Sequence, residues 1–183
     1  MGKRRSHLDP TGQAAFREGE VMEERRRFAS AVAQYKVSAD AGNVLGQLAL
    51  GNSYSAGRGV RKDLAEAARW YQRAYRNRCS SGATNLAVDL AGQGNRRRAI
   101  SWLKKAEALN DGCACLMLAK LYSEHARGHG TAIGLLKKAI SMSCGDINEE
   151  DKLEAASLLK RIEGGWTATR PQPQIRLWKA LRS

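Results

Sequence analysis

Residues 42–74 read GNVLGQLALGNSYSAGRGVRKDLAEAARWYQRA, and this stretch decides the fold. Two segments with apolar residues at helical spacing flank a turn that is rich in glycine. We expect Gly57 and Gly59 to close the first helix with positive φ angles, and Asp63 to cap the second helix with its carboxylate. The stretch therefore predicts one helical hairpin.

The hairpin recurs along the chain in three copies of decreasing fidelity. The second helices align at offsets of 36, 32 and 33 residues, and their small and large positions stay in register. The aligned positions are Ala31, Ala67, Ala99 and Ala132, and Tyr35, Tyr71, Leu103 and Leu136. A hairpin of this length cannot bury its apolar face alone, so the repeat predicts stacked hairpins. The expected fold is an all-α solenoid of about eight or nine helices.

At Gly42 to Ala74 the chain resembles the Sel-one-like repeat family, which is related to the tetratricopeptide repeats. The matching pattern is Gly-x3-small-x3-Leu-Gly-x2-Tyr-x2-Gly-x-Gly-Val-x2-Asp-x3-Ala-x2-Trp-Tyr-x2-Ala. The second and third copies lack the Gly-x-Gly-Val turn. The resemblance spans about 29–143 and implies a right-handed solenoid whose concave face binds other proteins, in a family of adaptors rather than enzymes.

The chain divides into a repeat domain and two tails. We expect a basic, flexible tail over residues 1–11, the helical-repeat domain over 12–163, and a basic tail containing Trp and Pro over 164–183. Within the domain, the best repeat covers 42–77, weaker repeats cover 81–109 and 112–143, and a capping helix covers 148–163. Thr11 is expected to cap the first helix, from about Gly12 to Arg27.

Composition and charge narrow the class of protein. The 183 residues carry 31 Lys and Arg against 18 Asp and Glu, giving a formal charge of +13. No stretch approaches the roughly 18 apolar residues of a transmembrane helix, and the first residues do not read as a secretory signal. We therefore expect a cytoplasmic protein, and the sequence sets no oligomeric state.

Residues for catalysis or metal binding do not form a known pattern. His125 and His129 stand four apart, but glycines beside them indicate a turn. The cysteines lack Cys-x2-Cys spacing, and no nucleophile elbow or phosphate loop is present. We expect no catalytic residue, no metal and no cofactor.

The candidate binding residues are polar positions on the first helix of each hairpin. Helical steps place them away from Leu50, Leu86 and Leu118, so we expect them to be exposed on the concave face. These positions are Asn52, Ser53, Asn85, Asp89 and Lys120. Simple solvation is the alternative interpretation of the same pattern.

A basic stripe is the second candidate surface. Arg69, Arg73 and Arg76 share one helix face, and a second run of arginines covers 96–98. The members of the stripe are Arg69, Arg73, Arg76, Arg96, Arg97 and Arg98. It is a solvated outer face, a site for an acidic protein, or a site for nucleic acid or anionic lipid.

The C-terminal tail is the third candidate. It contains Trp166 and Trp178 and is interrupted by two prolines, so it either folds back over the last hairpin or docks onto a partner. The preferred hypothesis is a non-enzymatic adaptor or scaffold that binds a protein on the concave face. The alternatives are an immunity protein that neutralises a cognate toxin, and binding of nucleic acid or an anionic surface.

Overall fold

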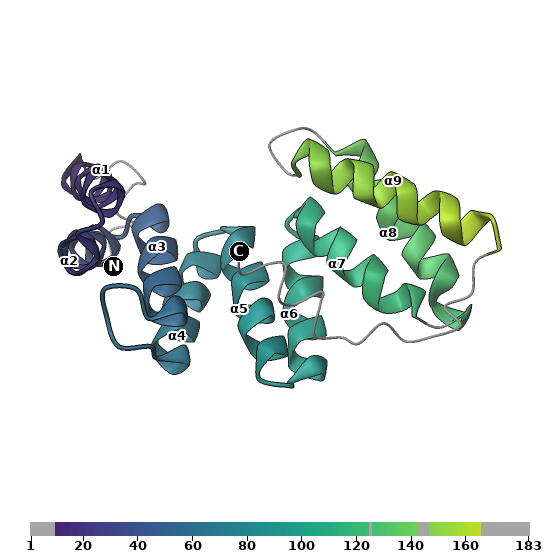
Figure 1. Cartoon of the computed structure of the whole chain (residues 1–183), viewed down its shortest axis with the longest axis horizontal. Coiled ribbons are helices and arrows are strands. Elements are labelled where there is room, and N and C mark those ends of the chain that lie inside the picture. Colours follow the sequence, from purple (N-terminus) through teal and green to yellow (C-terminus); the bar gives the residue numbers. More distant parts are fainter. Residues whose placement is uncertain (1–9, 125, 143–146, 166–183) are drawn as a thin grey trace, which may run out of the picture. The chain divides into compact units, whose positions relative to one another are not determined.

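A computed structural model describes residues 10–124, 126–142 and 147–165 (Figure 1). These residues contain nine α-helices, one short 3-10 helix and no β-strand. The helices are α1 (Pro10–Glu24), α2 (Phe28–Asp40), α3 (Val44–Ala56), α4 (Leu64–Arg76), α5 (Ser80–Gly92), α6 (Arg96–Glu107), α7 (Gly112–Ser123), η1 (Ala126–Gly128), α8 (His129–Ser141) and α9 (Glu149–Glu163). The expected all-α repeat of eight or nine helices is confirmed for these residues.

The helix ends follow the local chemistry of the sequence. Asn43, Asp63, Asp111 and Asn148 cap α3, α4, α7 and α9, each by accepting a hydrogen bond from a backbone N–H of the first turn. The prediction for Thr11 is wrong. Helix α1 already begins at Pro10, so Thr11 lies inside the first turn. A proline suits that position because its missing N–H would have no helical partner there.

The turn between α3 and α4 has the predicted glycine conformations. Gly57 and Gly59 have φ angles of 71° and 75°. A β-carbon on Gly59 would come within 2.3 Å of the carbonyl oxygen of Phe28, so the turn packs directly on the start of α2. Tight contact between this turn and the preceding hairpin therefore requires glycine.

The chain divides into two compact units, Met1–Asp89 and Leu90–Ser183, with the boundary inside α5. In the first unit, α1 packs on α2, α2 on α3, and α3 on α4. Its core contains Tyr35 and Leu50 together with the small residues Ala31 and Ala39, and Trp70 packs partly against it. Small residues let the helices approach closely while the rings fill the space between them.

In the second unit, α6 packs on α7, α7 on α8, and α8 on α9. Helix α7 is buried on almost every side, with residues 114–119 all inaccessible, as expected for a helix that is apolar all round. Leu136 of α8 and Leu158 and Ile162 of α9 belong to the same core. Helix α9 thus packs on both helices of the last hairpin.

Candidate functional site

A polar network joins α3, α4 and α5 in the first unit. The Tyr71 hydroxyl donates a hydrogen bond to Asn52 Oδ1 at 2.9 Å, and Asn85 Nδ2 donates to the same oxygen at 2.9 Å. One turn further along α3, the Ser55 hydroxyl donates to Asp89 Oδ1 at 2.7 Å. Two of the predicted binding residues, Asn52 and Asn85, are therefore in direct contact, although they lie 33 residues apart.

Burial sets the electrostatics of this network. Asp89 is only 4% exposed, and the Tyr71 ring is also buried. Burial, followed by the negative charge of Asp89, raises the pKa of Tyr71 well above its usual value, while the nearby Ser55 hydroxyl acts in the opposite direction. Tyr71 is therefore a neutral hydrogen-bond donor at physiological pH.

The structure separates the predicted residues of the first unit into surface and buried ones. Asn52 is exposed and Asn85 is half-buried, whereas Ser53 is 8% and Asp89 4% exposed. The expected exposure of Ser53 and Asp89 is therefore wrong. Ser53 turns inward and donates to the Ala49 carbonyl at 2.9 Å, and Asp89 faces Ser55 of α3.

Lys120 lies in the second unit and has a structural contact. Its side chain is 20% exposed, and its Nζ is 2.6 Å from Glu154 Oε2 of α9. Burial raises the pKa of Asp151, and the nearby Lys120 ammonium partly offsets that increase. Lys120 therefore helps to hold α9 on α7, and its role in partner binding stays a prediction.

The basic stripe is partly neutralised by neighbouring acids. Arg69 pairs with Glu66, and Arg73 lies 3.9 Å from Asp40 and stacks over the Trp70 ring. In the second unit, Arg96 Nη2 is 2.7 Å from Glu124 Oε2. The exposed members without such a pair among the described residues are Arg76, Arg97 and Arg98.

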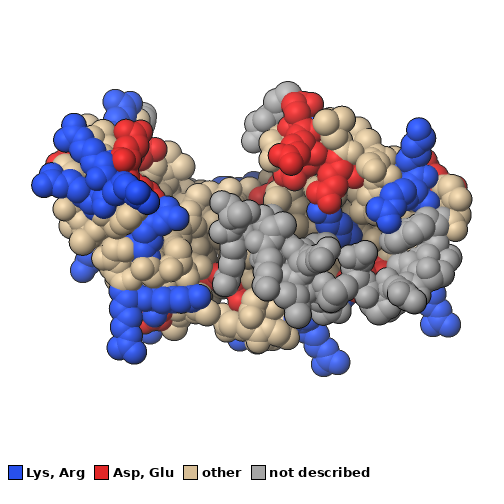
Figure 2. All heavy atoms as spheres, in the orientation of Figure 1, with Lys and Arg blue, Asp and Glu red and all other residues tan. Residues whose placement is uncertain are grey.

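The surface charge of each unit is uneven. Lys and Arg side chains gather over α1 and α2 in the first unit (Figure 2). In the second unit, Asp and Glu gather over the N-terminal end of α9, where Glu149, Glu150 and Asp151 form the first turn. Acidic side chains at that end are stabilised by the helix dipole, so they need no binding role.

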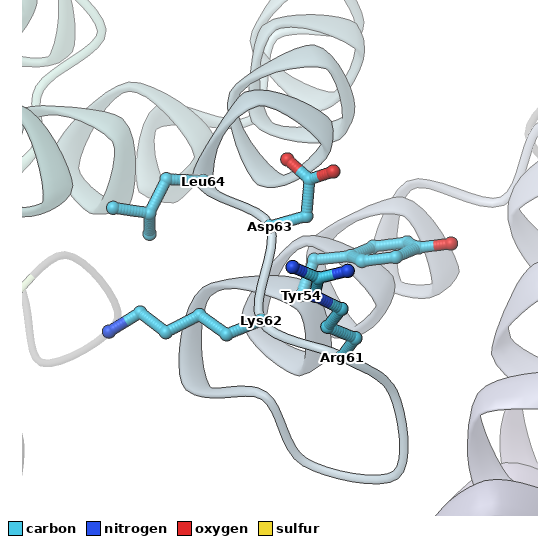
Figure 3. Close-up of a pocket in the computed structure, with 5 residues that line it drawn as sticks. All are labelled: Tyr54, Arg61, Lys62, Asp63 and Leu64. Atoms are coloured by element: carbon cyan, nitrogen blue, oxygen red, sulfur yellow. The ribbon is translucent and has the colours of Figure 1, made fainter.

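An open pocket of about 580 Å³ lies beside the α3–α4 turn (Figure 3). Tyr54, Arg61, Lys62, Asp63 and Leu64 line it, and the Arg61 side chain runs next to the Tyr54 ring. The Asp63 carboxylate is used to cap α4, where it accepts from the N–H groups of Ala65 and Glu66. The pocket therefore follows from the repeat turn itself.

Two members of the network were absent from the predicted binding set. The sequence placed Tyr71 in the core, which is correct for its ring but overlooks its hydroxyl. Ser55 lies one turn after Asn52 on α3, and this spacing is the only sequence signal for it. Trp166 and Trp178 lie outside the described residues.

No group of three or more His, Cys, Asp or Glu side chains in the described ranges is arranged to hold a metal ion. Within those ranges, no helix combines the length and apolar character needed to cross a bilayer.

The repeated hairpins define the chain as a helical-repeat protein, with an all-α solenoid fold. That fold is the one of the Sel1-like repeat proteins, as the motif at 42–74 predicts. The structure of c5321, a protective antigen present in uropathogenic Escherichia coli strains and displaying an SLR fold, matches with a TM-score of 0.66 and 23% identity over 85% of this chain. A Sel1 repeat protein from Oxalobacter formigenes matches with a TM-score of 0.67 and 21% identity over 94% of this chain.

These two solved structures are less than 25% identical to this chain, so the matches show a shared fold alone. This chain covers 34% of the length of c5321 and 70% of the Oxalobacter protein. The immunity protein Pa5087 from Pseudomonas aeruginosa aligns over 85% of this chain and 83% of its own, with 14% identity and a TM-score of only 0.41. That score carries no argument about function. No protein-family model and no curated protein sequence matches the chain.

Proposed function

We propose that this protein is a non-enzymatic interaction module that binds a protein partner on the α3–α5 face. We define this face by Leu45, Leu48 and Asn52 of α3 and Asn85 and Val88 of α5. The observation that carries the proposal is the Asn85–Asn52–Tyr71 network, because it holds polar groups in fixed positions at the surface of two neighbouring helices. Binding sites on rigid helices supported by hydrogen bonds lose little entropy when a partner binds.

An exposed apolar residue supports a protein as the ligand. Leu45 is 54% exposed and lies seven residues before Asn52, so both side chains belong to one stripe of α3. Leu48, on the same stripe, is half-buried. Apolar residues beside ordered polar groups are typical of the centre of a protein interface.

Binding rather than catalysis fits the titratable groups below the face. Tyr71 stays neutral because burial raises its pKa, and Asp89 is buried against Ser55. Neither group is placed to exchange protons with a substrate at the surface. The network thus supports the position of Asn52 instead of forming an acid–base pair.

A photo-cross-linking experiment tests the proposal. A photoreactive amino acid replaces Leu45 in one variant and Val21, which is 41% exposed on α1, in the control variant. We expect a discrete cross-linked protein only from position 45, and its loss when Asn52→Arg is added. Equal cross-linking from both positions, or persistence with Asn52→Arg, would contradict binding at the α3–α5 face.

We propose that Arg76, the exposed α4 member of the basic stripe without an acidic pair among the described residues, makes a secondary contact with an acidic group of the same partner. Glu66 and Asp40 partly neutralise Arg69 and Arg73, so α4 has little net positive charge with which to bind a nucleic-acid backbone. Binding of a random DNA duplex at about 150 mM salt, where the screening length is about 8 Å, separates the two hypotheses. Tight, sequence-independent binding at that salt would favour nucleic acid.

Neutralisation of a toxin is one form that this function could take, and a toxin gene beside this one would favour it over an adaptor.

We also propose that the protein is cytoplasmic. Cys79, Cys113 and Cys115 are free thiols, and burial raises the pKa of Cys113 to about 12 and that of Cys115 to about 11. Protonated, buried thiols are ordinary small core residues of proteins in reducing compartments.

A further inference from the structure

The α3–α5 face carries two side-chain amides, of Asn52 and Asn85, that are joined by one hydrogen bond. We propose that Asn52 and Asn85 together bind the main-chain N–H and C=O of one residue in an extended polypeptide segment of the partner. This inference rests on the proposed function, because it names the part of a protein that the α3–α5 face recognises.

The hydrogen bonds of the two side chains are only half used. Asn52 Oδ1 accepts from both Tyr71 and Asn85, and its Nδ2 donates to none of the described residues. Asn85 uses Nδ2 for that contact, and its Oδ1 accepts from none of the residues that the structure describes. A side-chain amide has two N–H donors and an acceptor oxygen with two lone pairs. The pair therefore offers an N–H from Asn52 and a C=O from Asn85 to a ligand.

The Asn52 and Asn85 amides hold each other in a fixed relative orientation before binding. Two donors converge on its oxygen from α4 and α5, so rotating the group by 180° would bring its NH₂ against Asn85 Nδ2. The Tyr71 ring is buried and its hydroxyl is neutral, which keeps the donor in place. A binding group held in this way pays less entropy when it captures its ligand.

The chemistry of the pair matches a neutral ligand better than a charged one. One donor beside one acceptor is complementary to one residue of an extended chain, whose main-chain N–H and C=O point to the same side. The Asp89 carboxylate lies below the face, one turn from Asn85 on α5, and disfavours phosphate or carboxylate ligands by repulsion. Neither Asn52 nor Asn85 carries the charge needed to hold a charged ligand.

The apolar stripe gives the segment a register. Leu48 and Leu45 lie four and seven residues before Asn52, which corresponds to about 6 and 10 Å along the helix. An extended chain rises about 3.3 Å per residue. An apolar side chain about two or three residues from the bound residue would therefore reach these leucines.

Peptide selection tests the interaction with the full chain. A library of random 12-residue peptides is selected against the wild-type protein, and the affinity of the enriched peptides is measured by calorimetry. Asn52→Asp keeps the acceptor for Tyr71 and Asn85 but removes the free N–H donors. We expect at least tenfold weaker binding, and no change for Gln13→Glu, the same chemical replacement at an exposed site on α1.

Amide-to-ester replacement in the enriched peptide tests the main-chain contact without altering the protein. An ester lacks the N–H and has a weaker carbonyl acceptor. Replacing the amide that supplies the bound N–H should weaken binding about five- to tenfold, replacing the next amide, which supplies the bound C=O, should weaken it less, and the other positions should have no effect. The bound residue should lie two or three residues from an apolar side chain. This result remains interpretable if Asn52→Asp fails to fold.

Three outcomes would overturn the inference. In the first, every ester analogue binds as tightly as the enriched peptide, while Asn52→Arg still blocks binding of that peptide. The α3–α5 face would then be a binding surface that does not recognise the main chain. Failure to enrich any peptide, together with a cross-link from position 45, would show that the face binds a folded surface. Self-association that Asn52→Arg abolishes would identify a second copy of the chain as the occupant. The absence of any cross-link from position 45 in the otherwise wild-type protein instead refutes the proposed function itself.

Discussion

The ring of Tyr71 lies directly over the backbone of Gly51. A β-carbon on Gly51 would come within 2.6 Å of Tyr71 Cε1, and the same relationship joins Gly19 to Tyr35 in the first hairpin, at 2.4 Å. In the second unit, the corresponding positions are Ala119 and Leu136, which share one core. A tyrosine thus stands opposite a glycine and a leucine opposite an alanine, so the pair keeps a nearly constant volume.

Gly51→Ala should destabilise the protein by about 1–3 kcal/mol, because the added methyl group overlaps the Tyr71 ring and the close-packed helices cannot separate freely. Adding Tyr71→Leu should restore much of that loss, since the pair then matches Ala119 and Leu136. Urea unfolding of the two single variants and the double variant measures this coupling.

Gly134→Ala is the matched control for Gly51→Ala. Gly134 lies inside α8, and no atom stands within 4 Å of the position of an added β-carbon. It should stabilise the protein by about 0.5–1 kcal/mol, through helix propensity alone. Equal effects of both substitutions would contradict the close approach of α3 and α4.

Two arginines occupy a backbone conformation that favours glycine. Arg26 and Arg78 have φ angles of 59° and 67°, just after α1 and α4, whereas Gly42 and Gly94 follow α2 and α5 with φ angles of 91° and 78°. Replacing either arginine by glycine should raise the free energy of unfolding by roughly 0.5–1 kcal/mol, since the relief of strain exceeds the added entropy of the unfolded chain.

Gly94→Ala provides the opposite control. Its β-carbon meets open space, so any loss of stability, expected at about 1 kcal/mol, reports the φ angle alone. Thermal melts of the Arg26→Gly, Arg78→Gly and Gly94→Ala variants measure these changes in stability. A loss of stability in Arg26→Gly would show that the arginine side chain makes a contact worth more than the strain.

The stability of the protein should depend on the ionisation of Tyr71 at alkaline pH. The pKa of Tyr71 is raised in the folded state, so above pH 10 the unfolded chain loses this proton while the folded protein keeps it. The contribution of Tyr71 is therefore complete below pH 10 and falls by about 1.4 kcal/mol for each pH unit above it.

Comparison with Tyr71→Phe isolates this effect. At pH 8 the wild-type protein should be more stable than the variant by about 1 kcal/mol, because it keeps the hydrogen bond to Asn52. The difference should shrink and then reverse as the pH rises from 10 to 11. A difference that is constant from pH 8 to pH 11 would show that Tyr71 ionises equally in both states.

The Lys120–Glu154 ion pair should contribute more than the Lys137–Glu163 pair. Both pairs hold α9, but the lysine side chains are 20% and 61% exposed respectively. We expect Lys120→Met to cost about 1 kcal/mol at pH 7 and Lys137→Met less than about 0.5 kcal/mol.

The pH dependence of Lys120→Met provides a second measurement. Without the ammonium, the already raised pKa of Asp151 should rise further, which nuclear magnetic resonance can follow. A group with a raised pKa stabilises the fold only when protonated, so the cost should be smaller at pH 3 than at pH 7. An unchanged Asp151 titration would contradict its proximity to Lys120.

Much of the fold could be predicted because its signals are local. Gly57 and Gly59 mark a turn that only their φ angles allow, and Asp63 marks the start of α4 through hydrogen bonds to its own first turn. The register of Ala67, Ala99 and Ala132 also follows from spacing, since each position recurs once per hairpin and all three are buried.

The candidate site could be predicted only in part. Helical steps correctly place Asn52 away from Leu50, but they cannot tell a face that meets solvent from one that meets the next hairpin. For that reason Ser53 and Asp89 were expected at the surface and are buried. Tyr71 was identified by its ring, whereas its role at the site depends on its hydroxyl.

The sequence by itself determined the hairpins, their order and the small residues that let them stack, because helix periodicity, capping and positive φ angles act over a few residues. Only the tertiary structure decided which polar side chains meet. Asn52 and Asn85 touch because α3 and α5 lie side by side, and Asp89 is buried because Ser55 of α3 faces it. Contacts across 33 or 34 residues depend on how whole hairpins pack, which no local pattern records.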